Sequence, residues 1–202
     1  STCNKDYTCL KGFCPSFVSV DAQLQARTTS HKIDGLPDPK HKVSDGVSNI
    51  ILTGIGGTGV LTVSAITAMA AHYEGKESTI LDMTGLAQKG GAVWSHIKIY
   101  EKNVKTFSHK IAPASANLFL ACDAVVGTKP EIQEVLSDKK TYSIINSDTI
   151  PVADFVTNRD LDFKDDEVLK VIDKTTKDID ITVPAIKIAE NLCGDAIAAN
   201  IM

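Results

Sequence analysis

The chain has 202 residues, of which 43% are hydrophobic and 5% aromatic, and its formal net charge is −4 at pH 7. This length suits one large domain whose core is rich in Val, Ile, Leu and Ala, as in α/β proteins with parallel sheets. The mild acidity gives no reason to expect a nucleic-acid partner, and no apolar run approaches the ~20 residues of a membrane-spanning helix, so we expect no membrane partner.

Residues 1–20 form a cysteine segment. Cys3, Cys9 and Cys14 lie close together, and Pro15 follows the last of them. A cysteine run that ends in Cys-Pro is typical of ferredoxin-type iron–sulfur ligand sets, in which a cubane cluster takes four thiolates. Two alternatives stay open: a zinc site, although structural zinc prefers closer Cys pairs, and a disulfide with a spare thiol, which needs an oxidising compartment.

We expect the chain to be a piece of a longer protein. It begins at Ser1 without an initiator Met, and residues 196–202 end inside an apolar helical pattern. No signal peptide is visible, and nothing suggests an oxidising compartment, so we expect a cytoplasmic location. The two remaining cysteines, Cys122 and Cys193, lie in apolar segments, which predicts buried and inert thiols.

A polar linker is expected at residues 21–46, and a compact domain at residues 47–202. In chain order, strands are predicted at 49–53, 78–83, 92–100, 118–122, 124–126 and 141–146, with 103–108 as a hairpin partner of 92–100. Helices are predicted at 60–73, from Pro130 within 129–137, at 165–174 and at 184–201, the last broken at Gly194. This alternation predicts a three-layer α/β/α domain with a mainly parallel sheet.

A first glycine loop, Gly-Ile-Gly-Gly-Thr-Gly at residues 54–59, follows a predicted strand and precedes a predicted helix. It satisfies G-x-G-x-x-G in the context in which that pattern binds phosphate. The glycines let the backbone approach an anion, the N–H groups of the helix start point at it, and Thr58 adds a hydroxyl donor. A dinucleotide site also needs an acid near the end of the second strand, where Asp82 is the candidate. A role limited to packing helix against sheet stays open.

A second glycine loop, Thr-Gly-Leu-Ala-Gln-Lys-Gly-Gly at residues 84–91, follows the second predicted strand. Ligands of open α/β sheets bind at the carboxyl ends of strands, so we expect this loop beside the first. Gln88 supplies an amide and Lys89 a cation, while Gly90 and Gly91 leave the backbone accessible. The two loops predict a site for phosphate or for the cofactor of a partner domain. A mobile surface loop with a solvated lysine is the alternative.

Several separated segments resemble one enzyme family. Residues 3–18 are similar to the ferredoxin-like segment of fused indolepyruvate ferredoxin oxidoreductases. Residues 51–60 and 82–93 look like the gamma-type domain of 2-oxoacid:ferredoxin oxidoreductases, and residues 123–131 and 146–151 fit the same domain. In the indolepyruvate enzymes this domain is the smaller subunit or the C-terminal portion of a fused chain. The resemblance covers nearly the whole chain.

The resemblance implies an enzyme that oxidatively decarboxylates indolepyruvate and other arylpyruvates with thiamine diphosphate. Such an enzyme transfers the acyl group to coenzyme A and passes electrons through [4Fe-4S] clusters to ferredoxin. Thiamine would bind on other domains, against which this domain packs, so this piece alone is expected to be non-catalytic. The implied cluster ligands are Cys3, Cys9 and Cys14, whose Cys-x5-Cys-x4-Cys spacing is looser than a standard ferredoxin run. The residues expected to shape the acyl-acceptor or coenzyme A channel are Gly54, Gly56, Gly57, Thr58, Gly59, Gln88, Lys89, Gly90 and Gly91.

Two other functions stay open. An NAD(P)- or flavin-binding dehydrogenase domain would use residues 54–59 and Asp82, although a hairpin at 92–108 would replace the crossover helix that a dinucleotide fold normally places there. A non-catalytic interaction domain would carry a zinc knuckle at its N-terminus. The histidines add no catalytic set, because His96 is expected to be a structural hydrogen-bonding residue and His72 a surface residue.

Overall fold

In the computed structural model, the described residues are 46–85, 90–106, 108–148, 165–177 and 180–201, together with Gly35 and Pro37. The cysteine segment with Cys3, Cys9 and Cys14, and nearly all of the predicted linker, lie outside these residues. Within them, no helix is both long enough and apolar enough to cross a membrane.

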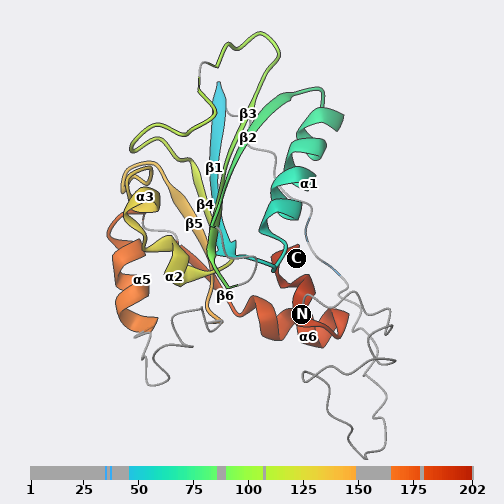
Figure 1. The fold of residues 1–202 in the computed structure, drawn as a ribbon, viewed down its shortest axis with the longest axis vertical. Coiled ribbons are helices and arrows are strands. Elements are labelled where there is room, and N and C mark those ends of the chain that lie inside the picture. Colours follow the sequence, from blue (N-terminus) through green and yellow to red (C-terminus); the bar gives the residue numbers. More distant parts are fainter. Residues whose placement is uncertain are drawn as a thin grey trace, which may run out of the picture.

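The described residues form one six-stranded sheet flanked by helices (Figure 1). The strands are β1 (Val47–Ile55), β2 (Glu77–Thr84), β3 (Ala92–Tyr100), β4 (Leu118–Ala121), β5 (Tyr142–Asn146) and β6 (Asp180–Val183). The helices are α1 (Val60–Tyr73), α2 (Ala124–Gly127), α3 (Pro130–Gln133), α5 (Asp165–Asp173) and α6 (Ala185–Cys193), and a 3-10 helix η2 (Ala196–Asn200) follows.

The strand order is β2-β3-β1-β4-β5-β6. The pairs β1–β4, β4–β5 and β5–β6 are parallel, whereas β3 lies antiparallel between β2 and β1. The predicted three-layer fold with a mainly parallel sheet is therefore confirmed. From β1 the chain first builds one side of the sheet and then returns to build the other, so β1 and β4 border a topological switch point, where open α/β sheets bind ligands.

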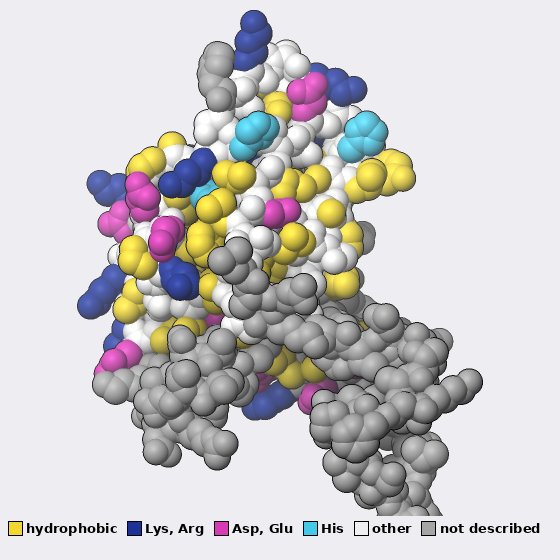
Figure 2. Space-filling model, in the orientation of Figure 1, with side chains coloured by type: hydrophobic (Ala, Val, Ile, Leu, Met, Phe, Trp, Pro, Cys, Tyr) yellow, Lys and Arg dark blue, Asp and Glu magenta, His cyan; other side chains and the backbone are white. Residues whose placement is uncertain are grey.

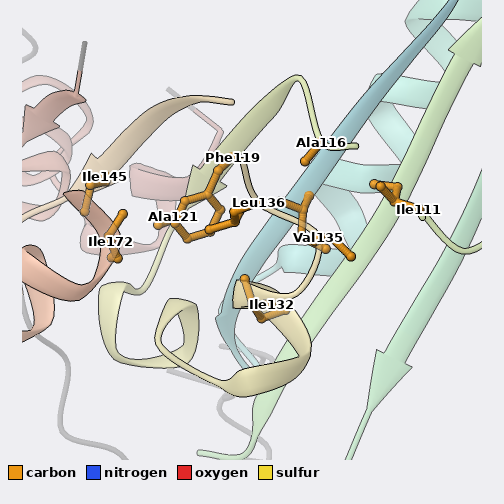
Figure 3. Close-up of a cluster of buried hydrophobic side chains, with 10 residues drawn as sticks. Ile111, Ala116, Phe119, Ala121, Ile132, Val135, Leu136, Ile145 and Ile172 are labelled. Atoms are coloured by element: carbon orange, nitrogen blue, oxygen red, sulfur yellow. The ribbon is translucent and has the colours of Figure 1, made fainter. Parts of the chain in front are cut away.

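The two faces of the sheet pack against different helices because neighbouring strand residues point in opposite directions. Leu52 of β1 joins the cluster of Val60, Val93, Ile97 and Cys122 beneath α1. Ile51 points to the other face, where Figure 3 shows Phe119 of β4 among residues from β5, α3 and α5. In Figure 1, α1 lies on one side of the sheet and α2, α3 and α5 on the other.

The predicted hairpin at 103–108 is wrong. Residues 103–106 and 108 form no strand, and β3 instead pairs with β2 along one edge and β1 along the other. Since a strand has two hydrogen-bonding edges, both of β3's are occupied, and the following segment has no edge to join. The hairpin is formed by β2 and β3.

The predicted strand at 124–126 is also wrong, because these residues form the short helix α2. Valines at 125 and 126 favour a strand, but Asp123 has extended backbone angles and its carboxylate accepts a hydrogen bond from the Val126 N–H at 2.8 Å. This is the geometry of a helix N-cap, which satisfies an otherwise unpaired donor of the first turn. Strand β6, which extends the sheet beyond β5, has no counterpart among the predicted strands.

Candidate functional site

The carboxyl end of β1 leads directly into α1 through the first glycine loop. Gly57 and Gly59 have φ values of 90° and 93°, in the left-handed region where side chains with a Cβ are strained. Gly59 is the N-cap of α1, no side chain caps this end, and the first turn contains no acidic residue. The loop therefore presents backbone N–H groups and the positive end of the α1 dipole, which favour an anion.

The structure brings the second glycine loop against the first. The Gly56 N–H donates to the Gly91 carbonyl at 2.7 Å, and the Gly90 N–H donates to the Gly56 carbonyl at 3.3 Å. These two bonds join the start of β3 to the end of β1, so the sequence-based expectation that the loops lie side by side is correct for the residues described. Gln88 and Lys89 lie outside the described residues.

Thr58 is held by bonds within the protein. Its Oγ1 donates to the Ile55 carbonyl at 2.7 Å, and Asn200 Nδ2 donates to the Thr58 carbonyl at 2.7 Å and to its Oγ1 at 3.1 Å. The one hydroxyl proton of Thr58 is thus engaged, and donation to an anion requires this bond to be exchanged. Sequence reasoning missed Asn200, because no local pattern links two residues 142 positions apart.

Gly54 has a packing role. A Cβ built on it would overlap Cγ2 of Val60 and contact the Cβ of Cys122 at 3.4 Å. The missing side chain lets β1 approach α1 and the end of β4 at the switch point. For Gly54, packing of helix against sheet is therefore a sufficient explanation on its own.

A shallow hollow and a larger cavity lie at this edge of the sheet. The shallow one, of about 310 Å³, lies on the first glycine loop and is lined by Ile55, Gly56, Gly57, Gly59, Val60, Leu61 and Val93. The larger cavity, of about 610 Å³, lies at the carboxyl ends of β4, β5 and β6, against α6 and η2. Asn200 lines the larger cavity and bonds to the glycine loop, so η2 connects the two hollows.

The residues at the end of β4 are buried and hold few charges. Burial, with a smaller contribution from the negative charge of Asp123, raises the pKa of the Cys122 thiol to about 11. Burial also raises the pKa of the Asp123 carboxyl, while hydrogen bonds from the N–H groups of Val126 and Val125 oppose this rise. Cys122 therefore remains a thiol at neutral pH and is a poor nucleophile. The expected burial holds for Cys122 but is wrong for Cys193, which is exposed.

Asp82 does not take the position of a ribose-binding acid. Its Oδ1 accepts a hydrogen bond from Ser64 Oγ of α1 at 3.3 Å and another from Ser95 Oγ of β3. The register places Asp82 opposite Ser95, which is opposite Leu52, before the glycine loop begins. Because β3 separates β2 from β1, Asp82 is two strand spacings, roughly 10 Å, from β1. The arrangement disfavours a dinucleotide site.

His96 has the structural role expected for it. Its side chain is buried, and Nδ1 accepts a hydrogen bond from the Ile111 N–H at 3.4 Å. Burial, together with the positive charge of Lys110, lowers its pKa to about 4. Neither His96 nor any other described His, Cys, Asp or Glu belongs to a group of three or more that could hold a metal ion.

The geometry is that of an open α/β domain with an anion-favouring edge at its switch point. Residues 49–202 match the family described as "Pyruvate ferredoxin/flavodoxin oxidoreductase", and the chain belongs to this family. The family resemblance drawn from the sequence is confirmed.

The chain is also similar to individual proteins. The chain is 29% identical over 155 residues to the indolepyruvate oxidoreductase subunit IorB of Archaeoglobus fulgidus, covering 76% of this chain and 72% of that protein. Among solved structures, the PORC subunit of Thermotoga maritima pyruvate oxidoreductase is 20% identical, with a TM-score of 0.49 and coverage of 77% of this chain and 71% of that one. The 2-oxoglutarate:ferredoxin oxidoreductase of Magnetococcus marinus is 15% identical, with a TM-score of 0.53 and coverage of 78% of this chain and 23% of that one. At this identity the similarity is one of fold alone.

Proposed function

We propose that this chain is the gamma-type part of a 2-oxoacid:ferredoxin oxidoreductase of the indolepyruvate type. The whole enzyme oxidatively decarboxylates arylpyruvates with thiamine diphosphate, forms acyl-CoA and passes electrons to ferredoxin in the cytoplasm. Thiamine diphosphate binds on other domains, and this domain helps to shape the acyl-acceptor channel. The similarity to an indolepyruvate oxidoreductase subunit supports this proposal. The related Magnetococcus marinus enzyme has been solved with 2-oxoglutarate, coenzyme A and succinyl-CoA bound.

The observation that carries the proposal is the pairing of the two glycine loops beside the uncapped start of α1. The bonds that join Gly56 to Gly91 and to Gly90 hold the loop ends in one arrangement. The N–H groups of the first turn of α1, which a helix leaves without intrahelical partners, and the α1 dipole are suited to a phosphate group of coenzyme A. In this role the glycines keep the backbone open to the ligand, Lys89 adds a positive charge and Gln88 an amide donor. Coenzyme A supplies the thiol that accepts the acyl group, and this chain binds and orients it.

The cysteine segment has a separate role in the proposal. Cys3, Cys9 and Cys14 serve as thiolate ligands of a [4Fe-4S] cluster on the electron path. A domain boundary between residues 20 and 47 separates this segment from the gamma-type domain. Because neither part binds thiamine, the isolated chain has no arylpyruvate-dependent activity.

The test is reconstitution of the enzyme from this chain and the thiamine-binding part. We expect indolepyruvate- and coenzyme A-dependent reduction of ferredoxin by the complex, and no activity from either part alone. Lys89→Ala should raise the KM for coenzyme A with little change in the KM for indolepyruvate. The control, Lys140→Ala, changes an exposed lysine just before β5 and should leave both constants unaltered. Activity of the isolated chain, or NADH binding at micromolar concentration in a fluorescence titration, would overturn the proposal.

A further inference from the structure

The helix α1 is unusual for a surface helix because it carries no Asp, Glu, Lys or Arg in its 14 residues. Its buried residues, Val60, Ser64 and Ala71, face the sheet. A helix with one face on a core normally has charged residues on the opposite face. By comparison, α5 contains four acids and a lysine in nine residues, and α6 contains Lys187 and Glu190. The outer face of α1 therefore lacks the composition of a face in water.

Large apolar side chains stand on this outer face. Leu61, Ile66, Met69 and Tyr73 are 42%, 50%, 54% and 84% exposed, and exposed Ala65 lies between them. Leu61, Ala65, Met69 and Tyr73 recur every four residues, so they form one ridge along the helix. On the right of Figure 2, where α1 lies, apolar side chains stand among white atoms and beside a histidine. A contiguous apolar surface of this kind marks an interaction site.

The ridge is continuous with the candidate site. Leu61, at its first position, also lines the hollow on the first glycine loop. A partner that covers α1 therefore also reaches the mouth of this hollow. If a second copy of this chain packed on α1, it would cover the opening of this hollow with a surface that does not bind thiamine. Because the ridge adjoins the hollow, it instead suits a partner that receives a ligand from the glycine loop and must therefore face that loop.

We propose that the α1 face, defined by Leu61, Ala65, Ile66, Met69 and Tyr73, is the surface on which the thiamine-diphosphate-binding part of the enzyme docks. This inference rests on the proposed function and names the surface that it uses. The partner surface is apolar, because α1 offers no Asp, Glu, Lys or Arg to pair with and a charged partner would lose its hydration without compensation. Docking places the glycine loops at the boundary between the two parts.

The first test is photo-crosslinking in the assembled enzyme. Benzoylphenylalanine replaces Met69 of α1 in one variant and Val171 of α5, which is 40% exposed on the opposite side of the sheet, in the other. We expect the variant at position 69 to crosslink to a peptide of the thiamine-binding part, in the same chain or another, and the variant at position 171 not to do so. Crosslinking from position 171 alone would overturn the docking surface but keep the proposed function. An assembled enzyme that contains no thiamine-binding part would overturn both.

The second test uses charge. Met69→Glu should weaken assembly with the thiamine-binding part by at least about tenfold, because it places an unpaired carboxylate in an apolar contact. Val171→Glu is the matched control and should assemble as the parent does. Both side chains are exposed, so the Tm of the isolated chain should be unchanged. Normal assembly of Met69→Glu contradicts the proposal. So does a dimer of the isolated chain in sedimentation that Met69→Glu dissociates, because the occupant would then be a second copy.

Discussion

The side-chain amide of Asn200 donates to the carbonyl of Thr58 at 2.7 Å and to its Oγ1 at 3.1 Å, which ties η2 to the first glycine loop. Asn200→Ala should lower the free energy of unfolding by about 1–2 kcal/mol, since it removes two hydrogen bonds at a partly buried site. Backbone amide exchange at residues 57–59 should accelerate more than exchange in β4. Asn191→Ala, at an exposed position of α6, is the control for helix propensity. Equal effects of the two variants on the loop would contradict the coupling.

Gly54 and Val60 form a second coupled pair. Gly54→Ala should cost about 1–3 kcal/mol of stability, because the new methyl group overlaps the Val60 side chain, which is stiff at χ1. Combination with Val60→Ala should recover part of that cost, so a double-mutant cycle from urea unfolding should give a clear coupling energy. Gly75→Ala serves as the comparison, because a Cβ there meets open space and the strain comes only from a φ of 78°. Its cost should be independent of residue 60.

Because His96 is buried, we predict that the folded protein loses stability in mild acid. Its pKa is lowered on folding from 6.5 to about 4. The unfolded chain therefore binds the proton more tightly, and the contribution of His96 to stability, complete above pH 6.5, is lost as the pH falls towards 4, by roughly 3 kcal/mol at most. His96→Gln, which keeps an acceptor for the Ile111 N–H, should flatten the dependence of urea stability on pH between 6.5 and 4. His109→Gln, at an exposed position, should leave it as it is.

Cys122 and Cys193 should differ in reactivity towards iodoacetamide. Burial and the charge of Asp123 raise the pKa of the Cys122 thiol to about 11, so about one thousandth of it is thiolate at pH 8. Peptide mass spectrometry after brief alkylation should find Cys193 modified and Cys122 unmodified. In urea both should react alike, which controls for detection. Rapid alkylation of Cys122 in the folded protein would show that the end of β4 opens readily.

The cysteine segment leads to a prediction on iron. The proposed cluster ligands Cys3, Cys9 and Cys14 are three, whereas a cubane cluster takes four thiolates, so we expect the purified 202-residue chain to contain substoichiometric iron and acid-labile sulfide. Electron paramagnetic resonance of the reduced sample should give no full [4Fe-4S] signal. Complete iron and sulfide occupancy is the contrary result. Stoichiometric zinc would instead favour the interaction-domain alternative.

Elements with a complete local signal were predicted closely. The helix expected at 60–73 and the strand expected at 92–100 have the observed bounds of α1 and β3, because apolar spacing and alternation are properties of the segment alone. The break of the last helix at Gly194 is also correct: Gly194 closes α6 with a φ of 73°. Local signals gave the wrong secondary structure where a specific contact outweighed them. At 124–126, the Asp123 cap overrides the strand preference of two valines.

The candidate site was predicted in part for the same reason. Its glycines stand in recognisable loops, and the carboxyl-edge rule for parallel strands placed those loops together, as the Gly56–Gly91 bond shows. The insertion of β3 between β1 and β2 was not predicted, and it removes Asp82 from the site. The role of Asn200 was not predicted either, because its contact with Thr58 depends on where η2 lies.

The sequence by itself determined the fold class, the family, the glycine loops and the uncharged composition of α1, because each is carried by residues that are neighbours in the chain. Only the tertiary structure decided which strands are adjacent, what Thr58 and Asp82 bond to, and which side of α1 remains uncovered. These three features depend on contacts between segments that are distant in the sequence. Such contacts contribute free energy only once the sheet has assembled, so they leave no pattern along the chain.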